Sequence, residues 1–259
     1  MNLKQIRDEA WDIARETAVN DQDRMWSMRE MNRYINRTYK HIAKETRCIK
    51  DSETASVCFI NVAPVAYTTY QAGTLDYIWA NTLNDPLDPL SGGKYWLYHK
   101  NVSPLSYALH PSILDIEEMK WTDRQWRLTK VSVKKWQVNP WWEQVVGMPT
   151  EFATDLSTNK FSLNFRADFT DSLRLVVKRL PLVDLVSDTD VPEFRTNYHE
   201  LMINGILWQM YSKQDSQAFD GIKAEQYHQM YLKDIDEIKQ QEAYVDERLR
   251  PNYSMDGFR

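Results

Sequence analysis

The sequence is poor in cysteine and glycine, and each shortage argues against a class of protein. It has 2 cysteines and 7 glycines among 259 residues. Two cysteines cannot form a disulfide scaffold or a four-ligand zinc site, so we expect Cys48 and Cys58 to be reduced thiols. So few glycines argue against a glycine-lined cofactor loop. We therefore expect no cofactor and no structural metal.

Long apolar runs and an excess of basic charge are also missing. No run approaches the roughly 18 apolar residues of a membrane span, and the first eleven residues are charged where a signal peptide would be apolar. We therefore expect a soluble protein with no membrane partner. The 32 Lys and Arg against 37 Asp and Glu give a net charge of −5, whereas a protein that mainly grips duplex DNA is usually basic.

Helical patterns occupy both ends of the chain and strand patterns the middle. Apolar spacing predicts helices over about 3–18 and 24–47, a third beginning at Pro192, and a last one over about 218–246. Short β-type runs separated by Pro, Gly and Asn turns fill the residues between. The prediction is an α+β fold: a four-helix bundle formed by the N- and C-terminal helix pairs, with an inserted antiparallel, sandwich-like β domain. Its predicted parts are 1–50, 51–190, 191–246 and an extended C-terminal arm, 247–259.

A search for catalytic chemistry gives no assembled site. The five histidines form no metal-binding motif, and for His199 a packed or hydrogen-bonded side chain is preferred over a metal ligand. Asp188 and Asp190 form a D-x-D pair, which we interpret as helix capping because it precedes a predicted helix. A hydrolase built around His99 and His110 stays an alternative, but we predict no catalytic, cofactor-binding or metal-binding residue.

Basic side chains form one stripe of the second predicted helix, opposite its apolar stripe. A solvated face is the ordinary interpretation. The last helix, however, carries Asp220, Glu225, Asp234, Asp236, Glu237 and Glu242, and a basic and an acidic helix suit head-to-tail packing of neighbouring subunits. Phosphate groups are a third possible target. The interface candidates in this stripe are Arg29, Arg33, Arg37, Lys40 and Lys44.

Five tryptophans lie between residues 121 and 142. They could form a β-domain core, a carbohydrate-stacking platform or an interface, where Trp and Tyr are common anchors. The adjacent Trp141 and Trp142 favour the interface, because two neighbouring indoles on an irregular segment rarely both enter one core.

Three segments follow one another in an order typical of one family. They are a G-x-P turn within 146–155, an apolar strand ending in R-L-P-L within 172–182, and a helix start with P-E and Y-H within 191–201. With the short first helix, Asp21-Gln22-Asp23-Arg24 and the long basic helix, they resemble the head–tail adaptor proteins of tailed bacteriophages, also called connector or head-completion proteins. The resemblance covers both ends and residues 132–215 well, and 51–131 poorly. The family often has P-x-P where this chain has Phe165-Arg166-Ala167-Asp168, so the turn there departs from the pattern.

The resemblance implies a structural virion protein at the head–tail junction, assembled in the host cytoplasm and without enzymatic activity. Its subunits would form a ring, with twelve as the family expectation, between the portal protein and a tail or nozzle protein. DNA would pass through the channel without sequence-specific binding. The alternative is a carbohydrate-binding, lectin-like tail module that uses Trp141, Trp142, Tyr95 and Trp96.

Two further segments are expected to make contacts in such an assembly. The β region, about 51–190, is expected to face the tail, and its loop Asn81–Gly93 is expected to touch a neighbouring subunit or the tail component. The arm 247–259 is expected to dock onto the portal or onto a neighbouring subunit, because Pro251 ends the helix and the residues beyond it cannot bury themselves. Its anchor and charge candidates are Arg248, Arg250, Tyr253, Met255, Phe258 and Arg259.

Overall fold

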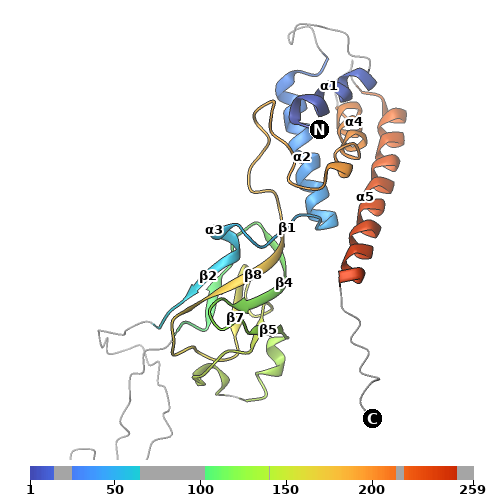
Figure 1. Ribbon diagram of the computed structural model, residues 1–259. Helices are drawn as coiled ribbons and strands as arrows, with labels where there is room; N and C mark the ends of the chain where they lie inside the picture. Colours follow the sequence, from blue (N-terminus) through green and yellow to red (C-terminus); the bar gives the residue numbers. More distant parts are fainter. Residues whose placement is uncertain (15–24, 65–102, 140, 214–218, 250–259) are drawn as a thin grey trace, which may run out of the picture. The chain divides into compact units, whose positions relative to one another are not determined.

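A computed structural model describes residues 1–14, 25–64, 103–139, 141–213 and 219–249 (Figure 1). Contacts divide the chain into two compact units. One, the helical unit, comprises Met1–Lys50 and Lys178–Arg259; the other, the sheet unit, comprises Asp51–Val177. Each unit has its own hydrophobic core. None of the helices in the described ranges combines the length and the apolar character needed to cross a membrane.

The helical unit is built around α4, which contacts helices from both parts of the chain. Its α-helices are α1 (Leu3–Ile13), α2 (Met28–Thr46), α4 (Met202–Tyr211) and α5 (Gly221–Leu249). The short α4 packs against α1, α2 and α5, and it is buried along most of its length. Large apolar side chains from these helices form one core, in which Ile35, Tyr39 and Ile238 are fully buried.

The start of α2 is fixed by a capping box that lies later than the predicted start. The Ser27 hydroxyl accepts a hydrogen bond from the Glu30 amide, and the Glu30 carboxylate accepts one from the Ser27 amide. The helix ends at Arg47, whose backbone is left-handed (φ 53°). Residues 20–23, which also offer N-cap side chains, fall outside the described residues, whereas the Ser27-x-x-Glu30 signal can be read from the sequence.

Gly205 marks the closest approach of three helices. A methyl group at its Cα would lie 2.7 Å from Cε2 of Tyr231 on α5 and 2.8 Å from Cγ2 of Thr38 on α2. Both neighbouring side chains are buried. Only a residue without a side chain fits between these helices, so the sequence of α4 sets how closely the three pack.

The segment that follows the sheet is held against α1 and α2 by side chains of those helices. Asn36 accepts a hydrogen bond from the Leu185 amide (2.7 Å) and donates one to the Leu185 carbonyl (2.9 Å). The buried Arg7 forms an ion pair with Asp188 (2.9 Å), and Lys40 forms one with Asp184 (2.6 Å).

In the sheet unit, the strands form one mixed sheet that curls into a half-barrel. They are β1 (Lys50–Asp51), β2 (Phe59–Val62), β3 (Ser106–Ala108), β4 (Ile113–Trp121), β5 (Arg127–Lys130), β6 (Glu151–Ala153), β7 (Lys160–Leu163) and β8 (Asp171–Arg179). The order across the sheet is β1-β8-β4-β5-β6-β7-β3, and β2 also pairs with β8. A one-turn helix, α3 (Ala55–Cys58), precedes β2.

Strand alternation places the core of this unit on one face of the sheet. On β8 the odd-numbered residues are buried, so Leu173, Leu175 and Val177 point inward. Trp121, at the end of β4, is fully buried, and its indole N–H donates to the Pro149 carbonyl at 3.1 Å.

The predicted four-helix bundle with an antiparallel, sandwich-like β domain is wrong, although the class α+β is right. The described residues form five α-helices and a curled sheet in which β5 and β6 run parallel. A parallel pair needs a long crossover, and residues 131–150 supply it with 3₁₀ turns at Val133–Lys135 and Trp142–Gln144. The prediction took the Asn and Pro signals of this segment for hairpin turns.

The predicted helix start at Pro192 is also wrong. The chain passes through a 3₁₀ turn at Thr196–Tyr198, and α4 begins only at Met202. The Asp190 carboxylate does not cap that helix, because it accepts hydrogen bonds from the Val186 and Ser187 amides (both 2.8 Å) and so closes the preceding turn.

Candidate interaction surface

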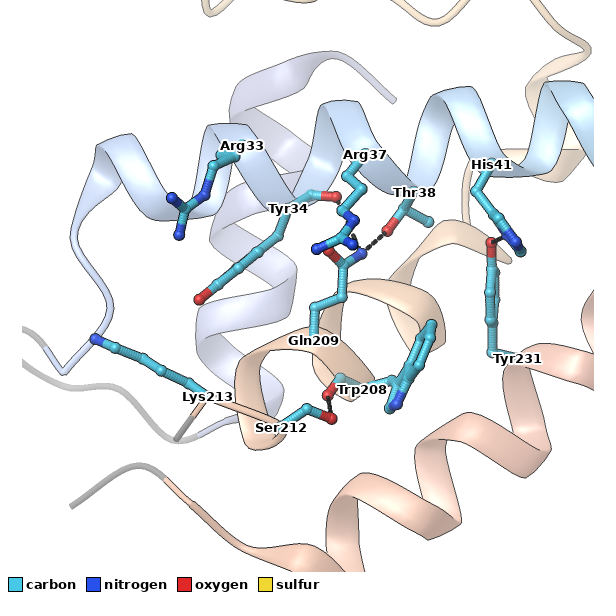
Figure 2. Close-up of a pocket in the computed structure, with 10 residues that line it drawn as sticks. All are labelled: Arg33, Tyr34, Arg37, Thr38, His41, Trp208, Gln209, Ser212, Lys213 and Tyr231. Carbon is cyan, nitrogen blue, oxygen red and sulfur yellow. Dashed lines mark hydrogen bonds between the residues drawn. The ribbon is translucent and has the colours of Figure 1, made fainter. Parts of the chain in front are cut away.

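A groove of about 520 Å³ opens on the helical unit between α2, α4 and α5 (Figure 2). We call it the α2–α4 groove. Its lining combines cationic, polar and aromatic side chains: Arg33, Tyr34, Arg37, Thr38, His41, Trp208, Gln209, Ser212, Lys213 and Tyr231. The α2 residues recur every three or four positions, so one face of this helix supplies a whole side of the groove.

The polar part of the groove is centred on Gln209. Its amide nitrogen donates to Oγ1 of Thr38 at 2.7 Å, which ties α4 to α2. Its carbonyl oxygen is buried and has no hydrogen-bond partner among the described residues. A buried acceptor without a donor is costly, and because less than 1 Å² of this oxygen is exposed, a group entering the groove cannot reach it in this conformation.

Three cations line the groove, and Lys213 forms an ion pair there. Its ammonium group lies 3.1 Å from the Glu30 carboxylate. Partial burial opposes ionisation of Glu30, but the bonds from Lys213 and from Ser27 outweigh it and lower the pKa of this carboxyl group, so Glu30 is ionised at neutral pH. The Arg33 guanidinium lies 5.5 Å from the centroid of the Tyr34 ring, and among the described residues no carboxylate neutralises Arg33 or Arg37.

Aromatic rings form the opposite wall. Trp208 stacks on His228 with ring centroids 4.4 Å apart, and its indole lies 6.0 Å from the Tyr231 ring. The Tyr231 hydroxyl is within hydrogen-bond distance of Nδ1 of His41, at 2.7 Å (Figure 2). Burial raises the pKa of Tyr231, so this hydroxyl stays protonated at neutral pH. The wall is therefore uncharged and flat, which suits apolar contacts.

The basic stripe predicted on this helix lies at the surface. Arg29, Arg33, Arg37, Lys40 and Lys44 are all exposed. Lys40 is engaged within the chain by Asp184, whereas no carboxylate in the described ranges pairs with the other four.

The acidic residues predicted on the last helix divide into two groups. Glu242 is buried and accepts a hydrogen bond from the Tyr198 hydroxyl at 2.8 Å. Asp234 accepts one from Asn204 (2.7 Å), and Asp220 accepts one from the Lys223 amide at the start of α5. The exposed acids of the predicted set are Glu225, Asp236 and Glu237.

The two adjacent tryptophans of the sheet unit lie in different environments. Trp142 is 6% exposed and packs on Trp136 with centroids 5.1 Å apart, whereas Trp141 is 60% exposed. Their proposed interface role stays a prediction, for which Trp141 offers the accessible ring. Tyr95 and Trp96, the other half of the suggested carbohydrate platform, fall outside the described residues, as does the loop Asn81–Gly93.

The arm candidates also lie outside the described part of the chain. This holds for Arg250, Tyr253, Met255, Phe258 and Arg259, and the side chain of Arg248 is not described. The backbone of α5 continues to Leu249, three residues beyond the predicted end of that helix.

The groups weighed for catalysis have structural partners where they are described. His199 is buried and hydrogen-bonded to the Phe194 carbonyl (3.2 Å), and His110 bonds the neighbouring Ser112 (2.8 Å). His99 falls outside the described residues. Within those residues, no cluster of three or more His, Cys, Asp or Glu side chains could hold a metal ion.

Sequence reasoning missed the α4 side of the groove. The sequence around Trp208 and Gln209 predicts only an amphipathic helix, because nothing in it indicates that Gln209 contacts Thr38, 171 residues earlier. Lys213 follows the end of α4 and carries no motif of its own.

An exposed basic helix face offers electrostatic complementarity to an acidic partner. The chain belongs to the SU10 adaptor protein family, whose model matches residues 1–253. It is thus a structural adaptor protein of a phage and a virion component that interacts with other head or tail proteins. Comparison with curated proteins gave no significant match.

Proposed function

We propose that the chain forms a closed ring that joins the portal vertex of a phage head to the tail and lets DNA pass through its channel. Family membership over residues 1–253 is the observation that carries the proposal. The exposed basic face of α2 supports it, because head-to-tail contacts in a ring would cover a face that a lone subunit leaves open. The partners would be the portal protein, a tail or nozzle protein and further copies of the chain, twelve in all by the resemblance.

This proposal predicts that the protein binds heads that carry a portal but lack adaptor and tail. Purified protein is mixed with such DNA-filled heads, and the particles are separated and imaged by electron cryomicroscopy. We expect saturable binding and a closed ring at a single vertex. Heads that take up no protein, or that carry isolated subunits without ring closure, would contradict the proposal.

We also propose that residues 250–259 dock onto the portal. The sequence supports this, since Tyr253, Met255 and Phe258 are spaced as separate apolar anchors beyond Pro251. A chain truncated after Leu249 keeps the whole of α5 and should melt like the full-length protein, yet bind heads at least about tenfold more weakly. Replacing the three anchors by alanine separates their part from that of the arginines. Full head binding by the truncated chain would reject this role.

A further inference from the structure

The α2–α4 groove combines positive charge with an aromatic surface. Arg33 and Arg37 supply the charge at the rim, and Trp208 supplies the accessible part of the aromatic wall, since Tyr231 is only 2% exposed. The buried carbonyl oxygen of Gln209 takes no part, because an incoming group cannot reach it. A complementary occupant therefore brings a carboxylate or phosphate and an apolar side chain.

A protein segment meets these needs better than a nucleic acid backbone. Phosphodiester groups bring charge but no apolar side chain for the aromatic wall. A peptide can bring carboxylates and apolar side chains on one face.

One exposed stripe of α5 has this composition. Glu225, Gln229, Leu232 and Asp236 follow one another at spacings of four, three and four residues. At 100° per residue they fall within about 60° of the helix surface. All four are exposed, and the Gln229 amide donates one hydrogen bond to Glu225 at 2.7 Å, which leaves its second N–H available. We call these four residues the acidic stripe.

We propose that the α2–α4 groove of one subunit receives the acidic stripe of α5 from a second copy of this chain. The two carboxylates meet Arg33 and Arg37, and Leu232 packs on the Trp208 ring. The inference rests on the proposed ring, and it assigns the surfaces that bring neighbouring subunits together.

The two surfaces point in different directions on the same subunit. Tyr231 of α5 lines the groove, and on the helical wheel the stripe is centred about 130° away from it. Groove and stripe are thus distinct patches, and a contact between them is head-to-tail, the kind that closes into a ring or continues as a filament. At 1.5 Å per residue, Arg33 and Arg37 lie about 6 Å apart along α2 and Glu225 and Asp236 about 16 Å apart along α5, so the two arginine side chains must extend in opposite directions along the groove to meet both carboxylates.

A reciprocal charge-reversal experiment tests the contact. The groove variant carries Arg33→Glu and Arg37→Glu, and the stripe variant carries Glu225→Lys and Asp236→Lys. Because each variant alone brings like charges together, we expect each to assemble on portal-bearing heads about a hundredfold more weakly than the parent protein. When the two variants are mixed, each contact between a groove variant and a stripe variant joins opposite charges again. The mixture should therefore recover rings in which the two variants alternate in equal amounts. Native mass spectrometry gives the composition, and cryomicroscopy of the heads gives the closure.

A matched control reverses two exposed lysines of the sheet unit, Lys134→Glu and Lys160→Glu, which changes the net charge as the groove variant does. It should assemble like the parent. If the parent forms rings and the groove and stripe variants do so equally well, the groove–stripe contact is wrong while the ring stands. If the groove variant forms rings but loses affinity for a short DNA duplex, the groove is a phosphate-binding surface and the inference is overturned. If the parent forms no ring, the proposed function itself fails.

Discussion

Replacing Trp121 by alanine is expected to destabilise the sheet unit by about 3–5 kcal/mol, the usual cost of deleting a fully buried indole. Trp121 is fully buried at the end of β4 and packs edge-on against Phe169 with ring centroids 5.1 Å apart. The substitution also removes the indole N–H that satisfies the Pro149 carbonyl. A cavity and an unpaired buried acceptor thus arise together.

The measurement is urea unfolding of both proteins, with hydrogen exchange of the sheet amides to report on this unit, since two compact units need not unfold in one transition. The matched control is Trp126→Ala, which removes the same side chain from a position that is 59% exposed. Its stability should change by no more than about 0.5 kcal/mol. Equal losses for the two variants would show that burial of Trp121 does not support the sheet.

Gly205→Ala is expected to destabilise the helical unit by about 1–3 kcal/mol, as overpacking of a tight core does. Alanine is the better helix former by about 1 kcal/mol, so propensity alone predicts stabilisation. Sterics should decide the outcome, because the new methyl group would lie 2.7 Å and 2.9 Å from two atoms of the buried Tyr231 ring. That ring cannot move without disturbing its hydrogen bond to His41.

Gly221→Ala is the control for this substitution. Gly221 begins α5, and its nearest contact would be the exposed Phe219 ring at 3.3 Å, which is free to turn away. Thermal unfolding followed by the helix signal in circular dichroism should show a loss for Gly205→Ala and none for Gly221→Ala. A Gly205→Ala protein as stable as the parent would mean that α4 shifts to accept the methyl group.

The faces of α2 could be predicted because a helix repeats every 3.6 residues whatever surrounds it. Ile35, Tyr39 and Ile42 are buried as their spacing indicates, and Arg33 and Arg37 are exposed. Met28 is the exception: its spacing also places it on the apolar stripe, but it lies in the first turn of α2 and is 41% exposed.

The direction of β6 could not be predicted. The segments that form β5 and β6 are short, and no residue between them indicates whether β6 runs parallel or antiparallel to β5. Asp190 illustrates the same limit. Its carboxylate could cap a helix that follows it or close a turn that precedes it, and in the structure it accepts hydrogen bonds from the Val186 and Ser187 amides of the preceding turn. The groove is least predictable of all, since Gln209 and Thr38 meet only after α2 and α4 have packed.

The make-up of the helical unit from the first 50 residues and those after 177 has a consequence for synthesis on the ribosome. All residues of the sheet unit emerge before α4 and α5 exist, so that unit can fold while α1 and α2 still lack the helices that cover their apolar faces. At about 5–20 residues per second, making the residues between takes roughly 6–26 s. During this interval the apolar side chains of Ile35, Tyr39 and Ile42 are exposed and can contact other nascent chains. Misassembly would therefore begin on polysomes, where many copies are made close together.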